Sequence, residues 1–159
     1  EVNIVNAEVL LKERGIDLVE ESHSERGAFS SSMRAEVVTE QKTYTVAGTL
    51  FGNEMPRLVL VDDFRLEAYL DGVLFVFHHD DVPGIIGKVG TIFGGHNVNI
   101  AQMSVGRAGQ SAGGAAIGVL NLDSEPPQPA MDDVLAHPHI RSASVVKLPK
   151  AGELPPWLG

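Results

Sequence analysis

The stretch His79-Asp80-Asp81-Val82-Pro83-Gly84-Ile85-Ile86-Gly87 decides the fold of the second half of this chain. The apolar run over residues 74–77 predicts a strand that leads into it. Pro83 is expected to open a helix, because a residue without an N–H is tolerated at the first helical position. The N–H groups of Gly84 and Ile85 would then point out of the helix end, where they attract an anion.

Two side chains in the same stretch complete a candidate ligand site. His79 and Asp81 are two residues apart, so they project to one side while the chain stays extended. A carboxylate beside the helical N–H groups and an ammonium beside Asp81 together describe a free amino acid. The alternative for Asp81 alone is a helix N-cap.

The residues that follow predict the order βαββαβ. Apolar residues return on one helical face between positions 85 and 93. Strands are expected at 73–79, 98–105, 115–122 and 140–148, with a second helix around 131–135. This order is ferredoxin-like. Three glycines lie on the other side of the first helix and indicate close backbone approach of a ligand or partner: Gly84, Gly87 and Gly90.

The first half is expected to be mostly β, which makes the chain an α+β protein. Asn6 is a candidate cap for a helix at 7–14, and strands are expected at 16–19, 33–38, 43–51, 57–61 and 64–68. One short helix covers little of such a sheet, so part of the natural core of this half is expected to be missing from the chain. The predicted divisions are 1–70, 71–148 and a flexible tail at 149–159.

Composition excludes several classes of function. The 159 residues include no cysteine, which excludes disulfides and thiolate chemistry, and the net charge of −9 disfavours nucleic-acid binding. No apolar run is long enough to span a membrane and no signal peptide is evident. The absence of cysteine fits a cytoplasmic protein. His78 and His79 alternate across a strand, so no shared metal site is predicted. No dinucleotide-binding G-x-G-x-x-G follows a strand, so no cofactor is expected to bind this chain.

Several motifs together resemble one enzyme family. In the second half they are Asp81-Val82-Pro83-Gly84-Ile85-Ile86-Gly87-Lys88-Val89-Gly90, Asn97-Val98-Asn99-Ile100-Ala101-Gln102-Met103 and Val105-Gly106-Arg107. In the first half they are Val2-Asn3-Ile4-Val5-Asn6-Ala7, Lys12-Glu13-Arg14-Gly15-Ile16 and Val46-Ala47-Gly48-Thr49-Leu50-Phe51-Gly52. The second half resembles an ACT domain, a small amino-acid-binding module. The whole of 2–148 is similar to the C-terminal part of long-form D-3-phosphoglycerate dehydrogenase, with a partial intervening domain before the ACT domain.

The resemblance implies a regulatory region without catalytic residues, because the family's catalytic and NAD-binding domains lie outside the matched part. NAD would belong to the parent enzyme. The implied effector is L-serine or another small amino acid. It would be held by His79, Asp81 and the helix start at Pro83, Gly84 and Ile85 of one subunit, and by Asn99 of the other. Asp81 stands where some relatives have asparagine. The two subunits of a homo-oligomer would pair through the edge strand that contains residues 98–105.

A second candidate site lies in the first half. Arg57 and Arg65 are on consecutive predicted strands across a tight turn, where cross-strand neighbours approach each other. Two guanidinium groups that face one way suit a phosphate, and the resemblance implies an anion site at about this position. The alternative is two solvated basic residues on an acidic protein.

Other functions share this fold. A free-standing amino-acid sensor and a purely structural assembly domain both remain alternatives. An RNA-recognition motif has the same βαββαβ order, but it stacks bases on aromatic residues of its central strands. The strand at 115–122 has no aromatic residue, which argues against RNA.

Overall fold

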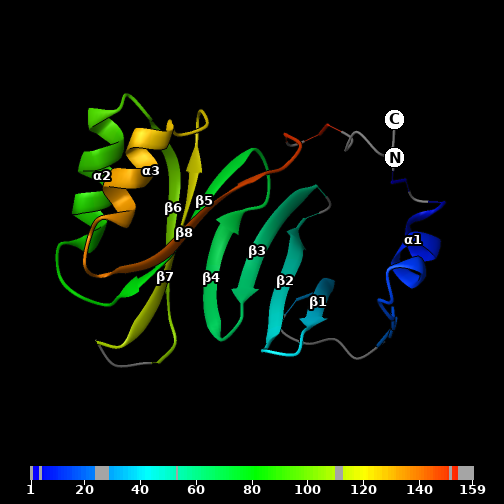
Figure 1. The fold of residues 1–159 in the computed structure, drawn as a ribbon. Coiled ribbons are helices and arrows are strands. Elements are labelled where there is room, and N and C mark those ends of the chain that lie inside the picture. Colours follow the sequence, from blue (N-terminus) through cyan, green and yellow to red (C-terminus); the bar gives the residue numbers. More distant parts are fainter. Residues whose placement is uncertain are drawn as a thin grey trace.

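The computed structural model describes residues 2–3, 5–23, 29–52, 54–109, 113–150 and 152–153. Two antiparallel four-stranded sheets carry the fold, and two helices cover one of them (Figure 1). The first half contains α1 (Ala7–Glu13), β1 (Ser32–Val38), β2 (Thr43–Phe51), β3 (Met55–Val61) and β4 (Phe64–Tyr69). The second half contains β5 (Val73–Asp80), α2 (Ile85–Gly95), β6 (Ile100–Arg107), β7 (Ala115–Leu122), α3 (Gln128–Leu135) and β8 (Ile140–Lys147).

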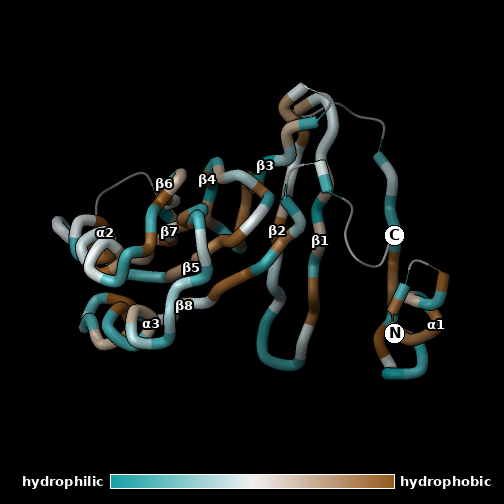
Figure 2. The backbone as a smooth tube through the Cα atoms, turned by 90° about the horizontal axis from the view of Figure 1, so that it is seen from above, coloured by the Kyte–Doolittle hydropathy of each residue, from teal (hydrophilic) through white to brown (hydrophobic). Residues whose placement is uncertain are grey.

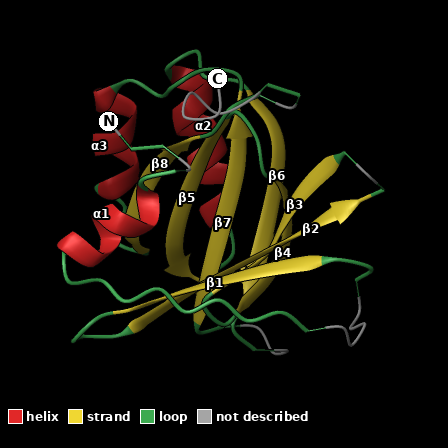
Figure 3. Cartoon of the chain, turned by 90° about the vertical axis from the view of Figure 1, so that its right-hand side faces the viewer, coloured by secondary structure: helices red, strands yellow, loops and turns green. Residues whose placement is uncertain are grey.

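The second half has the ferredoxin-like topology that its sequence predicts. Its strands lie in the order β6-β7-β5-β8, so the first and third strands of the βαββαβ unit are central. Helices α2 and α3 pack on one face of this sheet (Figures 1 and 3). Strand β6 lies at an edge, with β7 as its ladder partner among the described strands.

The core of this half lies between the sheet and its two helices. Phe75 and Phe77 project from β5 toward the helices and are fully buried. The Phe75 ring meets Phe93 of α2 edge-on, with ring centroids 4.8 Å apart. These aromatic contacts fix α2 against β5, and so they fix the turn that joins the two elements.

The first half forms the second sheet, in the order β1-β2-β3-β4. Its β3 and β4 pack on the face of the ferredoxin-like sheet that the helices leave free, where Leu58 and Ala68 contact Leu74 and Val119. Strands β1 and β2 lie farther from that sheet (Figure 2). An apolar cleft of about 770 Å³ lies between β1 and β2 on one side and β5 and β8 on the other.

Polar contacts tie the two halves together along β4. The Glu67 N–H donates to Ser104 Oγ at 3.0 Å, and Gln102 Nε2 donates to the Glu67 carbonyl at 3.2 Å. Buried Asn121 donates to the carbonyls of Tyr69 and Asp71 in the connection between the halves. These side chains satisfy backbone groups of an edge strand that would otherwise be unpaired.

The structure corrects some predicted boundaries. The strand predicted at 16–19 is wrong: these residues lie in no ladder, and the Ile16 N–H instead bonds to Leu11 O at the end of α1. Strand β6 begins at Ile100 instead of position 98, because Asn97 has a left-handed φ of 57° that interrupts an extended chain. Asn6 lies at the N-cap position of α1, but its side chain accepts from the Asn3 N–H and makes no capping bond.

The predicted tail falls mostly beyond what the structure describes. Residues 151 and 154–159, Trp157 included, lie outside the described residues. Within the described part of the chain, no helix has the length and apolar character needed to cross a membrane.

Candidate effector site

The helix after β5 starts two residues later than the sequence predicts. The Val82 N–H bonds to the Asp80 carbonyl at 2.9 Å, so the chain already turns at Asp81. Gly84 is the N-cap, with a φ of 89° that favours glycine, and α2 begins at Ile85. Pro83 therefore precedes the N-cap, and the expectation that it occupies the first helical position is wrong. The orphan N–H groups of the helix start belong to Ile85, Ile86 and Gly87.

His79 lies at the end of β5 with its ring buried beneath the helices. The residue is 1% exposed and its ring stacks on Phe77, with centroids 5.1 Å apart. Its Nδ1 lies 2.8 Å from the Asp80 carbonyl oxygen, so Nδ1 carries the proton and donates it. In the neutral ring Nε2 is then an acceptor. This buried atom has no hydrogen-bond partner among the described residues, an arrangement that costs about 1–3 kcal/mol.

The Asp81 carboxylate is bonded to residues from two other parts of the chain. Its Oδ2 forms an ion pair with Arg107 Nε at 2.8 Å and accepts from the Gly113 N–H at 3.0 Å. Its Oδ1 accepts one longer bond, 3.3 Å, from Arg107 Nη2. The carboxylate thus joins the turn to the end of β6 and to the start of β7. Because the chain turns at Asp81, the extended conformation expected from His79 to Asp81 is not present.

Asn99 lies at the opposite end of the same sheet. Its Nδ2 donates to Asp123 Oδ2 at 2.7 Å, next to the last residue of β7. Asp80, beside Asp81, pairs instead with Ala115, the first residue of β7. Asn99 precedes β6 instead of lying inside it, and one chain alone does not bring Asn99 to Asp81.

The edge strand β6 borders an apolar hollow beside α2. The hollow measures about 350 Å³ and its lining includes Gly87, Gly90 and Met103. A Cβ added at either glycine would meet no atom of the described residues within 4 Å, apart from its chain neighbours and its own helix backbone. Met103 and Val105 are 46% and 42% exposed. The close approach that the glycines predict is therefore not made within the chain.

Comparison with known proteins assigns both halves. Residues 1–62 match the family model of the D-3-phosphoglycerate dehydrogenase intervening domain, and residues 72–139 match that of the ACT domain. The chain carries a D-3-phosphoglycerate dehydrogenase intervening domain followed by an ACT domain. The match lies in the intervening and ACT domains, and neither of these is a catalytic domain of the family.

The individual relatives agree with the domain matches. The chain is 32% identical over 147 residues to D-3-phosphoglycerate dehydrogenase of Methanocaldococcus jannaschii, which uses 92% of this chain and 27% of the relative. It is 34% identical over 148 residues to the proteins of that name from Archaeoglobus fulgidus and Bacillus subtilis, using 93% of this chain and 28% of each relative. The chain spans little more than a quarter of the length of these relatives.

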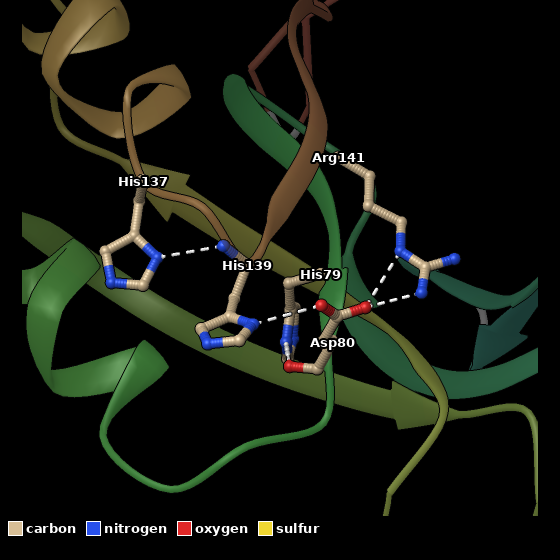
Figure 4. A network of polar contacts seen from close by, with 5 residues as sticks. All are labelled: His79, Asp80, His137, His139 and Arg141. Carbon is tan, nitrogen blue, oxygen red and sulfur yellow. Dashed lines mark hydrogen bonds and ion pairs between the residues drawn. The ribbon is translucent and has the colours of Figure 1, made fainter.

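A hydrogen-bond network beside the turn from β5 to α2 is not predicted by the sequence (Figure 4). Asp80 Oδ1 accepts from Arg141 Nε at 2.9 Å, and Asp80 Oδ2 lies 3.1 Å from His139 Nδ1. The hydrogen bond from His139, followed by that from Arg141, lowers the pKa of Asp80. His137 Nδ1 accepts from the His139 N–H at 3.3 Å. The network joins β5 to the start of β8, and no local motif announces partners about sixty residues apart.

His78 and His79 lie on opposite faces of the ACT sheet. His78 faces β4, where its ring meets Phe64 edge-on at 5.8 Å, and its Nδ1 contacts Ser142 Oγ. Burial lowers the pKa of His78. Among the described residues, no group of three or more His, Cys, Asp or Glu is placed to hold a metal ion.

The two arginines of the intervening domain are not cross-strand neighbours. Arg57 pairs in register with Tyr69, and Arg65 pairs with Leu60. The Arg57 guanidinium lies 4.2 Å from the centroid of the Tyr69 ring and donates to the Pro56 carbonyl. With Val61 opposite Phe64 at the turn, Arg65 faces Leu60, three residues along β3 from Arg57. The expected juxtaposition is therefore wrong, and an anion at either arginine stays a prediction.

Proposed function

We propose that this chain is the regulatory and oligomerisation region of a D-3-phosphoglycerate dehydrogenase, and that it binds L-serine or a similar amino acid at an ACT dimer interface. The observation that carries the proposal is the buried Nε2 of His79, which has no partner among the described residues and lies at the end of the strand that turns into α2. A buried acceptor beside a helix start suits a zwitterion that brings both a donor and an anion.

The ligand's three polar groups have matching partners at the turn. The carboxylate would meet the N–H groups of Ile85, Ile86 and Gly87, which begin α2. The hydroxyl would donate to His79 Nε2. The ammonium would donate to Asp81 Oδ1, whose bond from Arg107 is the longer of the two that this arginine makes. A carboxylate oxygen has a second lone pair for such a donor.

Pairing of two β6 edges would bring Asn99 to this site. An antiparallel pair centred on a two-fold axis at Met103 sets position 99 of one chain opposite position 107 of the other. Arg107 is already bound to Asp81, so Asn99 of the partner subunit would lie beside the ligand. The Nδ2 of Asn99 donates to Asp123 Oδ2 within its own chain. The Oδ1 of Asn99 would then accept from the ligand's ammonium.

The longer protein would supply the chemistry. We propose that it is a cytoplasmic, NAD-dependent enzyme of L-serine biosynthesis whose catalytic and nucleotide-binding domains lie outside this chain. The domain divisions at 70/71 and 148/149 belong to the same proposal. They fit the break between β4 and β5 and the end of β8.

Serine is expected to raise the melting temperature of this chain, because a ligand that binds only the folded dimer stabilises it by mass action. Glycine lacks the hydroxyl that would reach His79, so it should give a smaller shift at equal concentration. Differential scanning fluorimetry followed by calorimetric titration measures both. If millimolar serine leaves the melting temperature unchanged and gives no heat of binding, the alternative of a purely structural assembly domain replaces the proposal. If the native gene product has only this length and still binds serine, the free-standing sensor is favoured.

Replacing Met103 with glutamate is expected to reduce the chain's oligomeric state. The substitution places two carboxylates together on the two-fold axis, where like charges directly opposite destabilise a strand pair. Met55 is the matched control, because it is 51% exposed against 46% for Met103 but lies on β3. Light scattering at micromolar concentration should show a lower mass for Met103→Glu and an unchanged mass for Met55→Glu. Equal masses for all three proteins would refute pairing through β6.

A further inference from the structure

One cationic side chain provides most of the donors that the Asp81 carboxylate has within the chain. The Asp81 side chain is 13% exposed, so its charge is largely withdrawn from water. Its Oδ2 lies 2.8 Å from Arg107 Nε and accepts from the Gly113 N–H at 3.0 Å. At Oδ1 the hydrogen bond comes from Arg107 Nη2, at 3.3 Å. Arg107 therefore compensates a carboxylate whose burial would otherwise be costly.

The contact between Arg107 and Oδ1 is the weaker of the two that this arginine makes. Arg107 is the last residue of β6, and its side chain is 50% exposed. The 3.3 Å distance lies beyond the usual range of an N–H···O hydrogen bond. A guanidinium has several N–H donors, and at an exposed position water can satisfy those that leave Oδ1. This contact can therefore be replaced without leaving a buried donor unpaired.

The ammonium of an amino acid would compete with Arg107 for this oxygen. This step rests on the proposed function, in which the ligand's ammonium donates to Asp81 Oδ1. Ammonium and guanidinium are both positive, so two such groups at one oxygen repel each other. The repulsion is stronger here than in open water, because the carboxylate between them is largely buried. Each cation therefore weakens the contact that the other makes with Asp81.

We infer that Arg107 is a built-in competitor of the effector and sets how tightly the site binds it. In the unliganded chain Arg107 pairs with Asp81, and a bound amino acid displaces Arg107 Nη2 from Oδ1. Because coupling between two binding events is reciprocal, the effector loosens Arg107 by the same factor by which Arg107 weakens the effector. The neighbouring Gly106 packs closely against the Arg65 carbonyl of β4. The release of Arg107 thus takes place where the ACT sheet contacts the intervening half.

Calorimetric titration of serine into charge-removal variants tests this competition. Arg107→Met keeps an unbranched side chain without the charge, and it should bind serine about two- to fivefold more tightly than the unchanged chain, which is the range expected for a half-exposed ion pair. Arg107→Lys keeps the charge but loses the planar fork, so its affinity should lie in between. Arg141→Met is the matched control, because Arg141 donates to the adjacent carboxylate, Asp80. Its affinity for serine should equal that of the unchanged chain.

The outcomes separate this inference from the function on which it rests. If the unchanged chain binds serine and Arg107→Met binds it equally or more weakly, the inference is overturned and the effector site stands. If none of the four proteins binds serine, the effector site is refuted and the inference falls with it. Binding by Arg107→Met alone supports a site that the arginine keeps closed. Urea unfolding shows beforehand which variants are folded, and Arg107→Lys carries the comparison if Arg107→Met is not.

The reciprocal effect is measurable at Arg107 by nitrogen-15 NMR. The Nε–H signal of Arg107 is the one that the Arg107→Met spectrum lacks. Saturating serine should make this proton exchange with water about two to five times faster, which is the same factor that separates the affinities. The Nε–H proton of Arg141 should exchange at an unchanged rate. An exchange rate at Arg107 that bound serine does not alter overturns the inference.

Discussion

Replacing Gly118 with alanine is expected to lower the free energy of unfolding by about 1–3 kcal/mol, the usual cost of overpacking a core. Gly118 lies in the middle of β7, in register with Phe77 of β5. A methyl group at this position would overlap the ring of Phe77, which is fully buried and stacks on His79. The ring stacks on Phe75 and His79 and borders the hollow beside α2, so the substitution must displace the aromatic stack or the strand.

Urea unfolding measures this loss, and Gly94→Ala is its control. Gly94 lies in α2 away from the hollow, and a Cβ there meets no atom of the described residues within 4 Å outside its own helix backbone and chain neighbours. The control should gain up to about 1 kcal/mol, because alanine is the better helix former. If Gly118→Ala unfolds at the urea concentration of the unchanged chain, Phe77 does not occupy the position that the core requires.

Much of the fold could be predicted from local pattern. The alternation in β1 and β2 and the helical periodicity of α2 each repeat over several turns or strand pairs, so their positions agree with the structure within two residues. The errors lie where one residue changes the backbone. A left-handed Gly84 displaces the helix start past Pro83, and a left-handed Asn97 delays β6. The apolar run at 16–19 resembles a strand, but no described strand lies beside it to pair with.

The positions of the candidate site residues on the strand end and the turn could be predicted, but their contacts could not. His79 and Asp81 follow from their positions beside a strand end and a helix start. The partner of Asp81 is 26 residues away, on a strand whose approach depends on the whole sheet. The separation of Arg57 and Arg65 likewise depends on the strand register, which sets Leu60 and not Arg57 opposite Arg65. Tertiary pairing decides such contacts, and a linear spacing carries little information about them.

Strand β6 gives the two halves a physical connection. At one end of β6, Arg107 forms an ion pair with Asp81 in the turn. In its middle, Gln102 and Ser104 form hydrogen bonds with the backbone of β4. A Cβ added at Gly106 would lie 2.7 Å from the Arg65 carbonyl oxygen, so β4 packs closely against this strand. A ligand that shifts Arg107 would therefore act on a strand that contacts the intervening half along several residues.

Asp81→Ala is expected to weaken serine binding by about ten- to hundredfold. A hydrogen bond to a charged group contributes about 1.5–3 kcal/mol, and each 1.4 kcal/mol is a factor of ten in affinity. The variant loses the proposed ammonium partner. It also frees Arg107 and the Gly113 N–H, which the carboxylate now holds. Asp81→Asn keeps an acceptor and should lose less than the alanine variant.

Asp80→Ala is the matched control, because the adjacent carboxylate faces Arg141 and His139 instead of the turn. Its loss should leave the affinity for serine unchanged in calorimetric titration at pH 7. It should, however, alter acid stability. The lowered pKa of Asp80 contributes stability that is present above the pKa of an unfolded aspartate and is lost as the pH falls through the folded value. Equal losses of serine affinity in the two variants would show that general damage to the turn, and not an ammonium contact at Asp81, accounts for the effect.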